Sequence, residues 1–160
     1  MALLMYLITV FMIGSAMYLA ASASGLSVSL YWDAVSAIFV LVPTFCLSVA
    51  SYSIGDLLNG FSNGFSDVKD KKLIKNSISL FEEMKNTCIM FGWIGTLIGW
   101  IIMSFSVGTG DGSMSDNTWA RFGLSFGVSI ITLLYGYLFS YIIFEPFKNQ
   151  YIKKLNNLEN

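Results

Sequence analysis

The sequence predicts an all-α membrane protein with four transmembrane helices, the third of which extends into the cytoplasm. Hydrophobic residues make up 55% of the 160 residues and charged residues only 12%, against about 25% charged residues in an ordinary soluble domain. Four apolar stretches contain no charged side chain. Each is close to the roughly 20 residues that cross the hydrocarbon of a bilayer as a helix. Strands are a poor alternative, because the stretches are too long and do not alternate.

The four stretches lie at about 1–23, 34–54, 87–107 and 122–144. The first could instead be a secretory signal, since Ala21-Ser22-Ala23 resembles a cleavage site. However, no Lys or Arg precedes this stretch and it is long for a signal. We therefore expect two membrane helices in 1–54, a short cytoplasmic loop and helix in 55–86, two further membrane helices in 87–146 and a cytoplasmic tail in 147–160.

The basic residues predict the orientation. Eight of the nine lie in the loop between the second and third stretches or after the fourth, and they are Lys69, Lys71, Lys72, Lys75, Lys85, Lys148, Lys153 and Lys154. An even number of crossings places both segments on one side, which the positive-inside rule makes cytoplasmic. Both termini are then cytoplasmic, and Arg121 and the turn-rich loop 108–119 face outward.

The inner loop, 55–86, divides into two parts. The dipeptides Asn59-Gly60 and Asn63-Gly64 should break the chain after the second helix. From Val68 onward, apolar and small residues recur at helical spacing, namely Leu73, Ser77, Leu80, Phe81 and Met84. We expect this helix to run unbroken into the third span. The alternative is a short amphipathic helix that lies on the lipid.

Small and hydroxyl residues form stripes on the last two spans. In the third span they are Gly92, Thr96, Gly99 and Met103, with Gly95 beside them. In the fourth span they are Ser125, Ser129, Thr132 and Gly136, and Gly123 and Gly127 form a G-x-x-x-G motif. Such stripes let helices approach closely and supply hydroxyls to their neighbours. They indicate either helix packing alone or helix faces that line a polar path.

No carboxylate and no other charged side chain lies inside a span. A coupled ion path needs a group that binds and releases the ion at mid-membrane, and carboxylates do this in pumps and transporters. Asp33, Asp56 and Glu145 lie only at the ends of the apolar stretches. Thr96 and Thr132 can hydrogen-bond or help to coordinate an ion, but they do not titrate in the physiological range. If the chain moves protons, the titrating carboxylate must therefore come from a partner.

Composition excludes several other functions. There is no histidine, which excludes histidine acid–base chemistry and most zinc sites. Nine basic residues against ten acidic ones leave no basic excess for a nucleic acid. Cys46 and Cys88 lie in or beside apolar stretches and should be free thiols, with a disulfide the lesser alternative. We expect no enzyme activity, no metal and no cofactor.

Three of the four spans resemble the MotA/TolQ/ExbB family of ion-driven motors. The segment Phe91-Gly92-Trp93-Ile94-Gly95-Thr96-Leu97-Ile98-Gly99 is similar to the family motif G-x-I-G-T-x-x-G. Ile131-Thr132-Leu133-Leu134-Tyr135-Gly136 is similar to the family's final span, which ends at a proline, here Pro146. In the second span, Asp33, Ser36, Val40 and Thr44 resemble a MotA pattern. The four-span layout favours MotA over the three-span relatives.

The resemblance implies a function and an assembly. It implies a homopentamer in the bacterial cytoplasmic membrane around two copies of a single-span MotB/TolR/ExbD-like partner, whose membrane aspartate carries H⁺ or Na⁺. The flow of that ion would drive mechanical work. By position, Thr96 and Thr132 would line the ion pathway near that aspartate. Gly92, Gly95, Gly99, Ser129, Tyr135 and Gly136 would line the pore or pack the helices.

Three departures from the family pattern stand out. Ile89 replaces a proline that precedes the third-span motif, and Pro43 stands where the family has glycine and should kink the second span. The inner loop lacks the large MotA domain, so its charges indicate a solvated helix face more than a rotor contact. The competing hypotheses are a non-conducting structural membrane protein and a small four-helix transporter, although a transporter needs a coupling carboxylate within a span.

Overall fold

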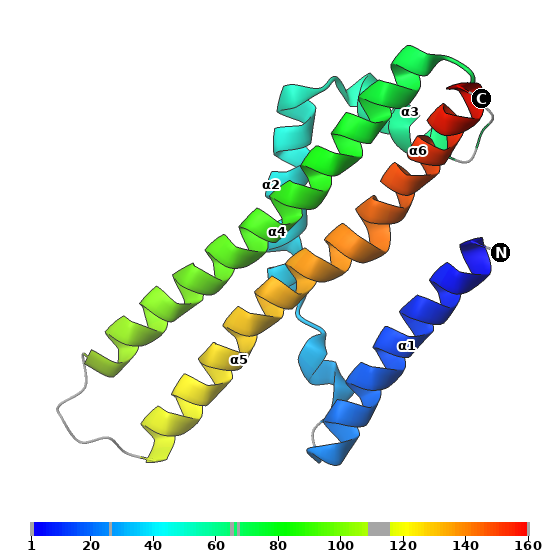
Figure 1. Cartoon of the computed structure of the whole chain (residues 1–160). Coiled ribbons are helices and arrows are strands. Elements are labelled where there is room, and N and C mark those ends of the chain that lie inside the picture. Colours follow the sequence, from blue (N-terminus) through cyan, green and yellow to red (C-terminus); the bar gives the residue numbers. More distant parts are fainter. Residues whose placement is uncertain (1, 26, 65, 67, 109–115, 160) are drawn as a thin grey trace. The chain divides into compact units, whose positions relative to one another are not determined.

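The computed structural model describes residues 2–25, 27–64, 66, 68–108 and 116–159, and within these ranges the chain is helical without strands. The elements are α1 (Ala2–Ala23), a 3₁₀ turn (Val28–Tyr31), α2 (Ala34–Ser51), α3 (Ile54–Gly64), α4 (Lys71–Gly108), α5 (Asp116–Leu138), a π-helical segment (Phe139–Phe144) and α6 (Glu145–Glu159) (Figure 1). Among the residues described, four helices are long and apolar enough to cross a membrane. This confirms the predicted all-α fold with four helices that could span a membrane. The irregular outer loop predicted at 108–119 falls largely on 109–115, outside the described residues.

The chain divides into two compact units, Met1–Ala34 and Val35–Asn160. The first contains α1, which carries no charged residue. Its serines donate to carbonyls one turn earlier, Ser15 Oγ to Met12 O at 3.0 Å and Ser24 Oγ to Ala20 O at 2.9 Å. These hydroxyls are therefore satisfied without leaving the helix, as an apolar surrounding requires.

In the second unit, the chain breaks after α2 at Tyr52 and Ser53 and not at Asn59-Gly60 as predicted, and α3 ends at Gly64. Both Asn-Gly dipeptides lie inside α3. Ser53 and Asp56 begin this helix by exchanging bonds: Asp56 N donates to Ser53 Oγ at 3.1 Å and Ser53 N donates to Asp56 Oδ2 at 3.3 Å. This reciprocal pair is a capping box. Gly60 is accommodated because α3 crosses α4 closely there, where a methyl group on Gly60 would lie 3.0 Å from Leu80 Cδ2.

The expected unbroken helix into the third span is confirmed, since α4 runs from Lys71 to Gly108. Asp70 begins it by accepting a bond from Lys72 N at 2.8 Å. Leu80, Phe81 and Met84 are buried as their spacing predicts. Leu73 was expected on the same face, but it is 41% exposed, whereas its neighbour Ile74 is fully buried. The buried face at the start of α4 is thus rotated by one residue from the predicted face.

The helix of the last predicted span does not end at Pro146, because α6 continues through it to Glu159. Proline has no N–H, and its ring clashes with the carbonyl four residues earlier in a regular helix. Here the preceding turn is π-helical, and Glu145 N–H donates to Ser140 O, five residues earlier. The π-helical segment lets the chain pass Pro146 without ending the helix. Pro43 likewise lies inside α2, which continues to Ser51.

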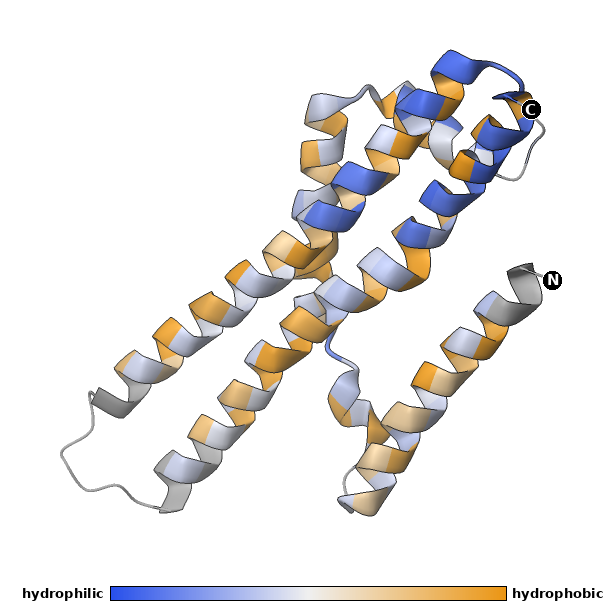
Figure 2. Ribbon diagram, in the orientation of Figure 1, coloured by the Kyte–Doolittle hydropathy of each residue, from blue (hydrophilic) through white to orange (hydrophobic). Residues whose placement is uncertain are grey.

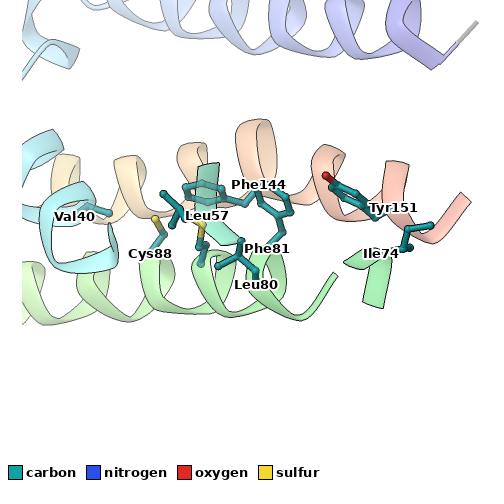
Figure 3. Close-up of a cluster of buried hydrophobic side chains, with 9 residues drawn as sticks. Val40, Leu57, Ile74, Leu80, Phe81, Cys88, Phe144 and Tyr151 are labelled. Atoms are coloured by element: carbon teal, nitrogen blue, oxygen red, sulfur yellow. The ribbon is translucent and has the colours of Figure 1, made fainter. Parts of the chain in front are cut away.

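Aromatic side chains hold α3, the start of α4 and α6 together. Phe81 is fully buried and lies 5.1 Å, centroid to centroid, from both Phe61 and Phe147, and 5.9 Å from Tyr151. Figure 3 shows Phe81 and Tyr151 among the buried side chains of this core. Hydrophilic positions gather on the first part of α4 and on α6, whereas the remainder of α4 and α5 is mainly apolar (Figure 2). The unit thus has a charged end with its own core and, over 87–105 and 122–144, a part without charged side chains.

Ile74→Ala should destabilise the charged end by about 2–5 kcal/mol, because it leaves a cavity in a packed core. Leu73→Ala is the matched control, since it truncates a neighbouring exposed side chain and should cost no more than about 0.5 kcal/mol. Thermal unfolding in detergent micelles, followed by circular dichroism, measures both. Equal loss in the two variants would contradict the burial pattern at the start of α4.

Candidate functional site

The small residues of α4 and α5 face each other across the uncharged part of the unit. A methyl group on Gly136 would lie 2.8 Å from Cys88 O and 3.0 Å from Gly92 Cα. One on Gly99 would lie 2.5 Å from Ser129 Cβ. The two backbones are therefore in direct contact, which only glycine permits at these positions.

At Gly95, α2 also takes part in the contact between α4 and α5. A methyl group there would meet Thr132 Cγ2 at 2.6 Å and the ring of Phe39 at 2.9 Å. Thr132 of α5 thus lies against α4 beside Thr96, and Phe39 of α2 covers the same position. The chain brings both predicted threonines to one level of the bundle.

Four hydroxyl residues, Ser36, Thr96, Ser129 and Thr132, form what we call the hydroxyl seam. Thr96 Oγ1 lies 2.9 Å from Ser129 O on α5 and 2.9 Å from Gly92 O on its own helix, and donates to these carbonyls. Thr132 Oγ1 and Ser36 Oγ are 2.8 Å apart, joining α5 to α2. Thr96 is 1% exposed and Thr132 6% exposed. Both threonine hydroxyls therefore make hydrogen bonds between helices inside the single chain.

Other predicted residues lie elsewhere. Tyr135 is partly buried beside the aromatic core and stacks on Phe139, with ring centroids 5.5 Å apart. Gly123 and Gly127, the G-x-x-x-G pair, would carry methyl groups with nothing within 4 Å. That motif therefore lies on a face of α5 that does not contact α4. Cys46 and Cys88 are both free thiols, but Cys46 is exposed.

Sequence reasoning did not assign α2 a place in this site. Ser36, Val40, Thr44 and Ser48 are all buried. They recur every four residues, so they mark one helix face. Thr44 Oγ1 donates to Val40 O at 2.8 Å and lies 3.4 Å from Cys88 Sγ. The spacing of these hydroxyls was the signal that could have revealed the packed face of α2.

A cluster of charged side chains lies just outside the uncharged stretches of α4 and α5. Lys85 Nζ pairs with Glu145 Oε2 at 2.5 Å, and Lys148 Nζ lies 3.7 Å from Glu145 Oε1. The hydrogen bond from Lys85 lowers the pKa of the Glu145 carboxyl, and the same bond raises the pKa of Lys85. Both groups stay ionised at neutral pH, and the pair weakens only as acid protonates Glu145.

The chemistry available to the seam is limited to hydrogen bonding and weak coordination by hydroxyl and carbonyl oxygens. The hydroxyls of Thr96 and Thr132 do not titrate near neutral pH. Over the described residues, no group of three or more His, Cys, Asp or Glu side chains could hold a metal ion. The seam can bind helices together or contact an ion, but it cannot itself take up and release a proton.

Gly136→Ala should lower the melting temperature in detergent, because the added methyl group meets backbone atoms that cannot rotate away. Gly127→Ala is the matched control on the same helix, where open space lets alanine gain about 1 kcal/mol in helix propensity. Circular dichroism melts of the two variants should therefore move in opposite directions. A stabilised Gly136→Ala variant would contradict the close approach of α4 and α5.

No known protein family matches the chain, and no curated protein is significantly similar to it. The resemblance of three spans to the MotA/TolQ/ExbB family remains a prediction that rests on the quoted residues.

Proposed function

We propose that the chain is the ion-conducting membrane subunit of a stator-like motor, which couples H⁺ or Na⁺ flow to mechanical work with a single-span partner that carries a membrane aspartate. The observation that carries the proposal is that two threonines, Thr96 and Thr132, lie at one level of the uncharged part of the helix bundle. A methyl group on Gly95, next to Thr96, would touch Thr132. These hydroxyls offer an ion contact but no titrating group.

Because the spans contain no carboxylate, we assign the uptake and release of the ion to the partner. From residue 87 to 105 and from 122 to 144 the chain has no charged side chain, so an ion that crosses needs an acid from elsewhere. Two copies of the partner inside a pentamer of this chain would supply it. Eight of the nine basic residues on one side support a multi-pass protein of the bacterial cytoplasmic membrane with both termini in the cytoplasm.

A non-conducting structural membrane protein is the second candidate, and a specific observation favours it. Thr96 and Thr132 are buried, and their hydroxyls already bond to Ser129 O and to Ser36. Packing explains these bonds without any ion, because polar side chains in a bilayer pair across helices. For conduction, the ion must compete for these hydroxyls or α2 must move away from α5.

Thr132→Val tests conduction against packing when it is compared with Ser36→Ala. Both changes break the bond between Ser36 and Thr132, but only the first removes the hydroxyl of Thr132. The test uses proteoliposomes that contain the chain and the proposed single-span partner. There Thr132→Val should reduce ion flux about fivefold, since one hydrogen bond contributes about 1 kcal/mol. Ser36→Ala should leave the flux near wild type.

Native mass spectrometry of each preparation supplies the control, because only variants that assemble like the wild type can be compared. Equal loss of flux in Thr132→Val and Ser36→Ala would assign the pair to packing. Unchanged flux in Thr132→Val and in Thr96→Val would remove both threonines from the ion pathway and support the structural candidate.

A further inference from the structure

The end of α3 is held by one lysine of α6. Lys154 Nζ donates to three backbone carbonyls: Asn63 O at 2.8 Å, Gly64 O at 2.7 Å and Ser66 O at 2.8 Å. The last carbonyls of a helix have no partner within the helix and carry the negative end of its dipole. A single ammonium group with three donors therefore binds the last two carbonyls of α3 and the Ser66 carbonyl just beyond the helix.

Two further contacts line up with this one along α6. Tyr151 is almost fully buried, and its hydroxyl donates to Gly60 O. The ring of Phe147 lies so close to α3 that a methyl group on Gly64 would be 2.8 Å from its Cε1. Phe147, Tyr151 and Lys154 are spaced four and three residues apart, so they lie on one face of α6. We call these three residues and the carbonyls they contact the α3–α6 clasp.

The clasp lies at the charged end, where it joins the continuation of α2 to the continuation of α5. α3 follows α2 after only Tyr52 and Ser53, and α6 continues α5 through the π-helical segment. In the uncharged part, Ser36 and Thr132 join the same two helices, α2 and α5. The chain thus ties α2 to α5 at two levels, once by hydroxyls and once through α3 and α6.

The three members of the clasp differ in kind. The rings of Phe147 and Tyr151 contact Phe81 and are part of the aromatic core. Lys154 lies at the edge, partly exposed, and contacts α3 through hydrogen bonds from its charged group, with its Nζ 5.2 Å from the centroid of the Tyr151 ring. Loss of its charge removes the three donors without creating a cavity in the core.

We propose that Lys154 is the releasable element of the α3–α6 clasp, and that neutralising it frees α3 while α4 and α6 stay folded together. The inference rests on these contacts and not on ion conduction. If the proposed motor function holds, the clasp sets how a movement of α5 reaches α2, through α6 and α3.

Hydrogen–deuterium exchange of the full chain in detergent micelles, followed by mass spectrometry, tests the clasp. Lys154→Gln should speed amide exchange in 54–64 by about tenfold, because hydrogen bonds from a charged donor are lost. Exchange in 71–85 and 145–151 should stay near wild type. Lys153→Gln is the matched control, since it removes the same charge from the adjacent exposed residue and should change nothing. Lys154→Arg keeps the charge and donors and should restore most of the protection.

Three results would overturn the proposal. The first is unchanged exchange of 54–64 in Lys154→Gln. The second is faster exchange spread evenly over α3, α4 and α6, including a variant that fails to fold, which would make Lys154 a general determinant of folding. The third is an equal effect of Lys153→Gln, which would indicate overall charge. None of these readouts depends on ion flux, so failure here leaves the proposed function untouched.

Discussion

The close approach of α4 and α5 is the contact on which the rest of the second unit depends. Gly92 and Gly136 bring the two backbones together, and Thr96 donates across the gap to Ser129 O. In a bilayer there is no hydrophobic driving force between helices, so association relies on tight packing and on hydrogen bonds. The glycines set the distance, and that distance places the Thr96 hydroxyl within reach of Ser129 O on the facing helix.

Beyond the uncharged part, α4 packs against α6, the continuation of α5, and different forces stabilise the contact. At the charged end, burial of apolar area in the aromatic core drives association. Phe81 and its aromatic neighbours supply that area, and the ion pair of Lys85 and Glu145 lies between the charged end and the uncharged part. Ser140 links them, because its hydroxyl donates to Lys85 O at 2.6 Å from within the π-helical segment. The bundle is thus continuous although its stabilising forces change along its length.

Much of this architecture could be predicted from the sequence, because membrane spans and long helices leave strong periodic signals. The spans and the unbroken α4 followed from hydropathy and from the spacing of Leu80, Phe81 and Met84. α3 was missed because the Asn-Gly pairs indicated a break in the chain, although Ser53 and Asp56 form a capping box that begins a helix. The continuation past Pro146 was missed because a π-helical turn depends on tertiary contacts, here those of Ser140.

The site was partly predictable for a similar reason. Small-residue spacing pointed to the facing stripes but not to which stripe faces which helix, so Gly123 and Gly127 were grouped with residues that lie elsewhere. The pairing of Thr132 with Ser36 depends on the position of α2, which no local pattern encodes. Assembly and partner are properties of more than one chain, and the proposal for them rests on the carboxylate that the spans lack.

The most direct test of the account is ion flux through the purified chain alone, compared with flux through the chain reconstituted with its single-span partner. A pH-sensitive or sodium-sensitive dye inside the liposomes reports the flux. The account predicts no flux above empty liposomes for the chain alone, and flux with the partner that disappears when the partner's membrane aspartate is changed to asparagine. Ion flux through the chain by itself would contradict it.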